Sequence, residues 1–109
     1  RRYPPFADLF SFTVTGADES RVIRAAKALR DALGYAVERR EELKPLSIEV
    51  LGPAGASVVK VNNRYRYRVF LVGKGCPALR RLVAEYLYAF YQHKENRGLD
   101  IFADCNAIQ

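Results

Sequence analysis

The sequence contains few of the residues that bind metals or form disulfide frameworks. It has two cysteines, Cys76 and Cys105, which lie far apart and form no CxxC pair, and a single histidine, His93. Structural zinc sites need clustered cysteine and histidine ligands, and secreted disulfide-rich domains need several paired cysteines, so the pattern predicts neither. We interpret the cysteines as reduced thiols of a cytoplasmic protein and His93 as a solvated residue near a helix end.

Long apolar runs and recognisable catalytic clusters are also missing. No run approaches the roughly 18 apolar residues of a membrane span, and no signal peptide opens the chain. The GKGC segment, residues 73–76, lacks the glycines and the following serine or threonine of a phosphate-binding P-loop. Asp100 and Asp104 share a strand face, but acid–base chemistry also needs a pocket, and the sequence indicates none. We therefore predict no catalytic residue, no metal, no cofactor and no membrane contact.

Arginine is the abundant charged residue. The 109 residues include 18 lysines and arginines against 12 acidic residues, and 13 of the 18 cations are arginine. The guanidinium fork suits phosphate and stacks on flat rings, which favours a nucleic-acid partner. The alternative is a solvated basic surface that keeps the protein soluble. The length suits a single domain spanning 1–109, and the start at Arg1 without a methionine is typical of a piece of a longer protein.

Hydrophobic periodicity predicts two helices among several strands. Gly34 leaves the end of the first helix open, because the helix either stops there or continues towards Pro45. The predicted elements are a strand at 7–16, a helix capped by Asp18 or Ser20, a strand at 47–53, an extended region at 57–72 with a turn at Asn62-Asn63, a helix from Pro77 that fades near Asn96, and a strand at 99–104.

This order predicts an α+β fold of the ferredoxin-like class. Strand, helix, strand, strand, helix, strand (βαββαβ) usually folds as a two-layer sandwich, with a four-stranded antiparallel sheet and both helices on one face. Pro4 and Pro5 restrict their own backbone and that of the residue before each, so we expect an extended N-terminal segment at 1–7.

Arg64, Arg66 and Arg68 alternate with Tyr65, Tyr67 and Val69 along one predicted strand. Burying three unpaired guanidinium groups costs several kcal/mol each, so we expect the tyrosines beneath the helices and the arginines on the open face. Alternate positions stand roughly 6–7 Å apart, close to the phosphate spacing of a nucleic-acid strand. This predicts a DNA-binding stripe, which Lys60 and Lys74 extend at its two ends. The alternative is that the arginines pair with carboxylates on neighbouring strands, such as Glu49, or prevent unwanted edge pairing.

Aromatic residues outside this strand predict a second kind of contact. Tyr88 and Tyr91 lie off the main apolar stripe of the second helix, where they either cover the helix pair or dock a neighbouring domain. Tyr3 and Phe6 in the N-terminal segment are further interface candidates. Base stacking on the sheet is not favoured, because the aromatic residues of the arginine strand are expected to point inward.

Four short motifs occur in an order that resembles a known family. They are Tyr3-Pro4-Pro5-Phe6, Leu51-Gly52-Pro53, Tyr65-Arg66-Tyr67 and Asp104-Cys105-Asn106. Together they resemble the C-terminal domain of primosomal protein N′, the replication-restart DNA helicase PriA, over essentially the whole chain. One departure lies at the end, where Cys105 fills a position that is aliphatic in the family and Ala107 a position that is proline.

The resemblance implies more than the residue patterns do. It implies a ferredoxin-like domain, similar to a ribosomal small-subunit protein, that helps bind branched or single-stranded DNA at stalled forks and packs against a helicase core. ATP hydrolysis with 3′-to-5′ unwinding, Mg²⁺ and structural zinc belong to other parts of such a helicase, so none is expected here. Single-stranded DNA-binding protein and primosome-loading proteins are expected partners of the parent. Two hypotheses follow: a non-catalytic DNA-binding accessory domain, or a protein-interaction module that docks on the helicase core or a restart partner.

Overall fold

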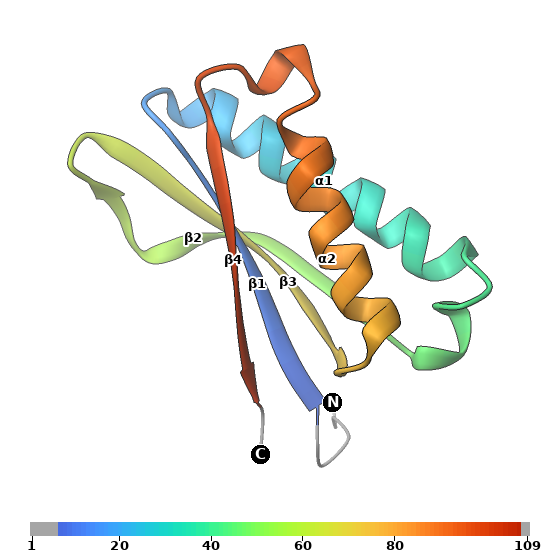
Figure 1. Ribbon diagram of the computed structural model, residues 1–109. Coiled ribbons are helices and arrows are strands. Elements are labelled where there is room, and N and C mark those ends of the chain that lie inside the picture. The colour runs from blue at the N-terminus through green and yellow to red at the C-terminus, as the bar shows by residue number, and fades with distance from the viewer. Residues whose placement is uncertain (1–6, 108–109) are drawn as a thin grey trace.

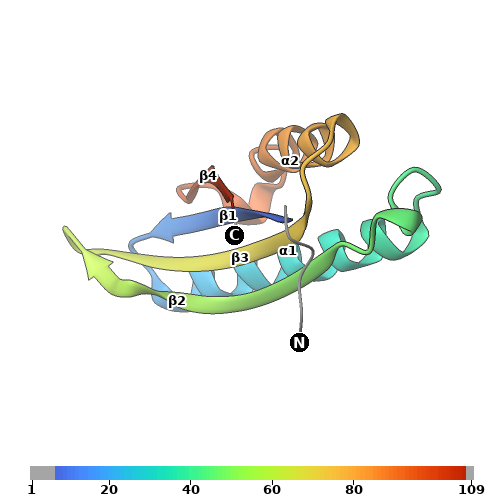
Figure 2. The same cartoon turned by 90° about the horizontal axis from the view of Figure 1, so that it is seen from below.

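A computed structural model describes residues 7–107, and it shows a sheet covered on one face by two helices (Figure 1). The elements are β1 (Ala7–Gly16), α1 (Glu19–Arg39), a 3-10 helix (Lys44–Leu46), β2 (Glu49–Val61), β3 (Arg64–Lys74), α2 (Pro77–Phe90), a second 3-10 helix (Lys94–Asn96) and β4 (Asp100–Ala107). All strand pairs are antiparallel, in the spatial order β2-β3-β1-β4 (Figure 2). The predicted ferredoxin-like sandwich is confirmed. The N-terminal segment before Ala7, with Tyr3 and Phe6, lies outside the described residues.

The hydrophobic core lies between the sheet and the helices. Phe10, Phe12 and Val14 point from β1 into one cluster with the buried faces of α1 and α2. Val22 and Leu33 of α1 are fully buried there, as their spacing predicts. Burial of each large apolar side chain stabilises the fold by roughly 1.5–3 kcal/mol. Because both helices use this one cluster, no helix or strand within residues 7–107 covers the opposite face of the sheet, which we call the open face.

Helix α1 begins at the predicted cap and continues past Gly34. The Asp18 carboxylate accepts hydrogen bonds from the backbone N–H groups of Ser20 at 3.0 Å and Arg21 at 3.3 Å, so Asp18 is the N-cap. Gly34 lies in the helix interior, where an added Cβ meets nothing within 4 Å. Glycine weakens a helix but does not stop it when the flanking turns are buried, and Ala36 and Val37 lie in the core beyond it.

The second helix is shorter than its pattern predicts. It ends at Phe90 rather than near Asn96, because the Asn96 side-chain amide donates to the Phe90 carbonyl at 2.8 Å and supplies a partner for the terminal turn. The chain then turns into the 3-10 helix, and His93 lies exposed immediately before it.

Strands β2 and β3 form a long curved hairpin (Figure 2). Asn62 and Asn63 both have positive φ, 52° and 62°, the backbone that a two-residue turn between twisted strands requires. The 47–53 and 57–61 segments belong to one strand rather than two, with register irregularities between Leu51 and Ala54 and between Gly55 and Lys60. The turn sets the pairing of the residues on either side of it, so it also sets their faces.

Candidate nucleic-acid interface

The side chains of β3 are divided between the two faces of the sheet as predicted. Val69 and Leu71 are fully buried in the core, and Tyr65 and Tyr67 pack against it. The Tyr67 hydroxyl donates to Glu19 Oε2 at 2.6 Å, at the edge of the helix layer. This hydrogen bond to a carboxylate raises the pKa of Tyr67. The arginines alternate with these residues and therefore lie on the open face.

Arg64 forms hydrogen bonds within the sheet through one of its guanidinium nitrogens. Its Nη2 donates to Asp100 Oδ2 at 3.0 Å and to the carbonyl and hydroxyl oxygens of Thr15 at 3.3 and 3.2 Å. The carboxylate-pairing alternative is therefore correct for Arg64, with Asp100 of β4 as the partner. The strand order brings β4 near β3 with only β1 between them, which the sequence alone does not reveal.

Arg66 and Arg68 differ from Arg64, because neither forms an ion pair or hydrogen bond within residues 7–107; we call these two residues the arginine pair. The Nε atoms of both are buried and lack an acceptor. On the neighbouring strand β1, Thr15 lies opposite Arg66 and Thr13 lies opposite Arg68. Since β3 is an interior strand, protection against edge pairing does not explain two arginines here. A guanidinium that lacks an acceptor can bind an oxyanion without first breaking a salt bridge.

The two lysines predicted to extend the stripe lie in different places. Lys60 is opposite Tyr65 in the hairpin, and its Nζ lies 5.2 Å from the centroid of that ring. It therefore belongs to the helix side of the sheet, and its predicted place on the stripe is wrong. Lys74 lies on the open face and is exposed, but it is six positions beyond Arg68, roughly 20 Å along the strand.

Two phenylalanines lie on the same face as the arginine pair, which the sequence reasoning missed. Phe102 of β4 pairs with Thr13, itself opposite Arg68, so the three residues form one row across the sheet. Its side chain is 48% exposed. Phe70 follows two residues after Arg68 and is half-buried. The period-two alternation of residues 99–104 places Phe102 on the same face of the strand as Asp100 and Asp104 and on the other face from Ile101. That pattern was sufficient to place Phe102 on the open face.

Two carboxylates lie on the β4 side of the arginine pair. Asp100 holds Arg64, and Asp104 lies exposed on the open face opposite Ser11 of β1. Phe102 lies between these two acids along β4. Negative charge at this edge would repel a phosphate chain, whereas it would not repel an uncharged base that lies over the ring.

The tyrosines of the second helix differ in their partners. Tyr88 is 71% exposed and has no hydrogen bond within the described part of the chain. Tyr91 is 54% exposed, yet its hydroxyl accepts from the Ile101 N–H at 3.1 Å and lies 3.4 Å from Asp100 Oδ1. It ties the end of α2 to β4, so its hydroxyl has a structural role at this junction. Tyr88 is the more exposed of the two tyrosines.

Residues 7–107 offer no site for catalysis by a metal. No group of three histidine, cysteine or acidic side chains in this range comes together to hold an ion. Cys76 and Cys105 are free thiols. No helix in the same range is both long and apolar enough to cross a membrane.

Comparisons with known proteins identify the family and the fold. The family model described as "Primosomal protein N C-terminal domain" matches residues 1–106. "Probable replication restart protein PriA" of Deinococcus radiodurans is 37% identical over 81 residues, and "Replication restart protein PriA" of a Synechocystis species is 30% identical over 69 residues. These matches cover 74% and 63% of this chain but 8% of each relative.

A solved structure is similar in fold alone. The designed protein "De novo designed protein Foldit4" aligns with a TM-score of 0.64 at 14% identity, covering 94% of this chain and 99% of that one. Its similarity to a designed protein says nothing of function, but the family match spans nearly the whole chain and agrees with the observed strand and helix order. The chain belongs to the family of primosomal protein N C-terminal domains.

Proposed function

We propose that this chain is a non-catalytic DNA-binding accessory domain of a replication-restart protein, and that the arginine pair contacts the phosphates of single-stranded or forked DNA. The observation that carries the proposal is the state of Arg66 and Arg68: two cations on the open face with no ion pair inside the described chain. An interior strand holds them in fixed register, roughly 6–7 Å apart. That separation suits adjacent phosphates of an extended strand.

The surroundings of the arginine pair support single-stranded rather than sequence-specific duplex binding. Phe102, and to a smaller extent Phe70, offers a ring on which an unpaired base can stack, and every base has a flat face. The flat surface of a sheet does not enter the major groove as a helix does. The net charge of +6 adds a long-range attraction that does not depend on sequence.

A protein-docking role is the second candidate, and Tyr88 is the observation that favours it. The ring lies on the solvent side of α2, and large aromatic residues that are exposed on one protein are often anchors at an interface. In this reading the domain docks on the helicase core of its own chain or on a restart partner. DNA binding that does not depend on Tyr88 would favour the DNA-binding role over the docking role.

The names of the relatives support a proposal about the longer protein. We propose that it is an ATP-dependent DNA helicase whose ATP, Mg²⁺ and zinc sites lie outside these 109 residues, acting in the cytoplasm with single-stranded DNA-binding protein and primosome loaders. The relatives carry the name replication restart protein, and this chain spans about 8% of their length.

Titration of the chain against fluorescein-labelled DNA tests the proposed role. A single-stranded oligonucleotide and a fork are added at about 50 mM salt, where phosphate contacts are weakly screened, and anisotropy is recorded. The double variant R66A/R68A is expected to weaken binding to both substrates. A matched double variant, R80A/R81A, removes the same charge from exposed positions on α2 and is expected to weaken binding much less, because only the long-range attraction is reduced.

Two results would contradict the proposal. One is an absence of binding to either substrate at low salt, which would favour the docking role. The other is an equal loss in R66A/R68A and R80A/R81A, which would show that net charge matters and the open face does not.

A further inference from the structure

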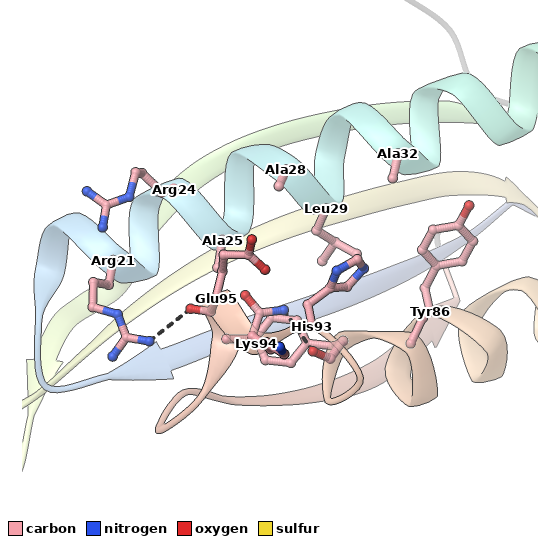
Figure 3. A pocket seen from close by; sticks show the side chains of 13 residues that line it. Arg21, Arg24, Ala25, Ala28, Leu29, Ala32, Tyr86, His93, Lys94 and Glu95 are labelled. Carbon is pink, nitrogen blue, oxygen red and sulfur yellow. Dashed lines mark hydrogen bonds between the residues drawn. The ribbon is translucent and has the colours of Figure 1, made fainter.

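A groove separates α1 from α2 on the side of the sheet opposite the open face (Figure 3). Its volume is about 660 Å³, within the range of sites that bind ligands or peptide side chains. Figure 3 shows Arg21 and Arg24 extending from α1 near one end and Tyr86 at the other, with His93, Lys94 and Glu95 between. The proposed DNA-binding residues take no part in it.

Side-chain hydrogen bonds, which we call clamps, join the α1 side of the groove to the α2 side at each end. At one end Arg21 Nη2 donates to the carbonyls of Glu95 and Arg97 at 2.8 and 2.6 Å, which fixes the second 3-10 helix to α1. At the other end Arg40 donates through both Nη atoms to the two carboxylate oxygens of Glu85, each at 2.7 Å. These hydrogen bonds lower the pKa of Glu85. Helix α1 is therefore tied to the segment after α2 at one end of the groove and to α2 itself at the other.

The floor of the groove is apolar and made of small side chains on the α1 side. Ala25, Ala28 and Ala32 follow one another at spacings of three and four, so they lie along one flank of the helix. Ala28 and Ala32 are exposed, whereas Leu29 and Phe90 close the floor from below. Side chains this short let another backbone approach closely, at the 8–10 Å that separates packed helix axes.

The rim of the groove is cationic. Its lining contains three cations and one carboxylate: the cations are Arg21, Arg24 and Lys94, and the carboxylate is that of Glu95. Neither Arg24 nor Lys94 forms an ion pair or hydrogen bond through its side chain within residues 7–107. An occupant with acidic residues beside its apolar surface would complement both the floor and this rim.

We propose that the groove binds an acidic amphipathic helix of a partner protein, which would lie between α1 and α2 as a third helix. From Arg21 to Ala32 the flank is about 17 Å long, which corresponds to about three turns of an occupant helix. Three turns present apolar residues at i, i+3 or i+4, and i+7 to the alanine floor, the usual pattern of helix-in-groove recognition. The acidic residues of the occupant then lie beside Arg24 and Lys94.

The same features argue against nucleic acid in the groove. Single-strand sites stack bases on exposed aromatic rings, and the centre of this groove offers alanine instead. The open face and the groove lie on opposite sides of the sheet, so DNA and the helix can bind at the same time. The chain would then join a DNA strand to a protein partner, and each site can be tested without disturbing the other.

A synthetic peptide tests the proposal with the whole 109-residue chain. The probe is a fluorescent peptide of about 16 residues with leucines along one helical face and glutamates beside them; a second peptide has lysine in place of every glutamate. Chain variants R24E and A28E place a carboxylate at the rim and on the floor, both at exposed positions. K27E makes the same charge change one turn away from Arg24, at an exposed position of α1 that does not line the groove, and is the matched control. Circular dichroism verifies that each variant is folded.

The acidic peptide is expected to bind, with R24E and A28E each weakening it roughly tenfold and K27E changing the affinity less than about twofold. The lysine peptide is expected not to bind, and R66A/R68A to leave peptide binding unchanged. Three results would overturn the proposal: no binding of the acidic peptide, equal binding of the lysine peptide, or a K27E effect as large as that of R24E. A loss of oligothymidine binding in R24E that exceeds its loss of peptide binding would assign the groove to nucleic acid and overturn it also.

Discussion

Replacing Gly52 with alanine is expected to destabilise the protein strongly, because this residue adopts a backbone that only glycine adopts readily. Its φ is +98°, and an added Cβ would lie 2.7 Å from the carbonyl oxygen of Arg68. A left-handed backbone costs an L-residue about 1–2 kcal/mol, and forced displacement of a packed neighbour adds about 1–3 kcal/mol. The substitution also disturbs the hydrogen bond from Arg30 Nε to the Gly52 carbonyl, which is 3.1 Å long.

The expected loss is therefore about 2–5 kcal/mol, a large part of the 5–15 kcal/mol that holds a typical domain folded. Gly34→Ala is the matched control, since it makes the same chemical change in a helix interior where the new methyl group meets nothing within 4 Å. Alanine at that position is expected to raise the free energy of unfolding by about 0.5–1 kcal/mol.

Urea unfolding followed by far-ultraviolet circular dichroism measures both changes in one experiment. The two variants should move the midpoint in opposite directions, with G52A far below the wild type and G34A above it. A G52A midpoint close to that of the wild type would refute the reasoning, because it would mean that neither the backbone strain nor the contact with Arg68 exists in solution.

Three further outcomes are expected. Phe102→Ala should weaken single-stranded DNA binding roughly tenfold or more, as expected for the loss of one base stack, while the free energy of unfolding falls by only about 1 kcal/mol because the ring is 48% exposed; an unchanged affinity would exclude stacking there. Glu85→Gln should cost about 0.5 kcal/mol of stability above pH 4.5, since both partners are partly exposed, and the difference from wild type should vanish as the pH falls through the lowered pKa of Glu85; a difference that is constant with pH would contradict the Arg40 clamp. Tyr67 should ionise at higher pH than a free tyrosine in an ultraviolet titration, and Glu19→Gln should lower its pKa; no change in that variant would rule out the hydrogen bond.

The period-two pattern of β3 was sufficient to predict its two faces. The energetic difference between burying a tyrosine and burying a guanidinium is large enough to decide the orientation without knowledge of neighbouring strands. The position of Lys60 could also have been predicted, because a two-residue turn at Asn62-Asn63 pairs Lys60 with Tyr65 and so places it on the tyrosine side.

Other features depended on tertiary structure. The pairing of Arg64 with Asp100 requires β4 to lie beside β1, and no local pattern specifies which strands are neighbours. The hydrogen bonds of Tyr91 to β4 depend on where α2 stops, and helix ends are poorly defined by periodicity. The groove between the helices follows from the Arg21 and Arg40 contacts, each of which joins residues more than 40 positions apart.

The central claim is that two arginines on the open face, which have no ion pair within residues 7–107, hold the phosphates of a DNA strand. The salt dependence of binding tests this claim most directly. With two or three phosphates neutralised on single-stranded DNA, a plot of log affinity against log salt should have a slope of about −1.4 to −2.1 for the wild type. The slope of R66A/R68A should be shallower by about 1.4, whereas R80A/R81A, with the same net charge, should keep the wild-type slope. An R66A/R68A slope equal to that of the wild type would contradict the account, because the phosphates would then be held elsewhere.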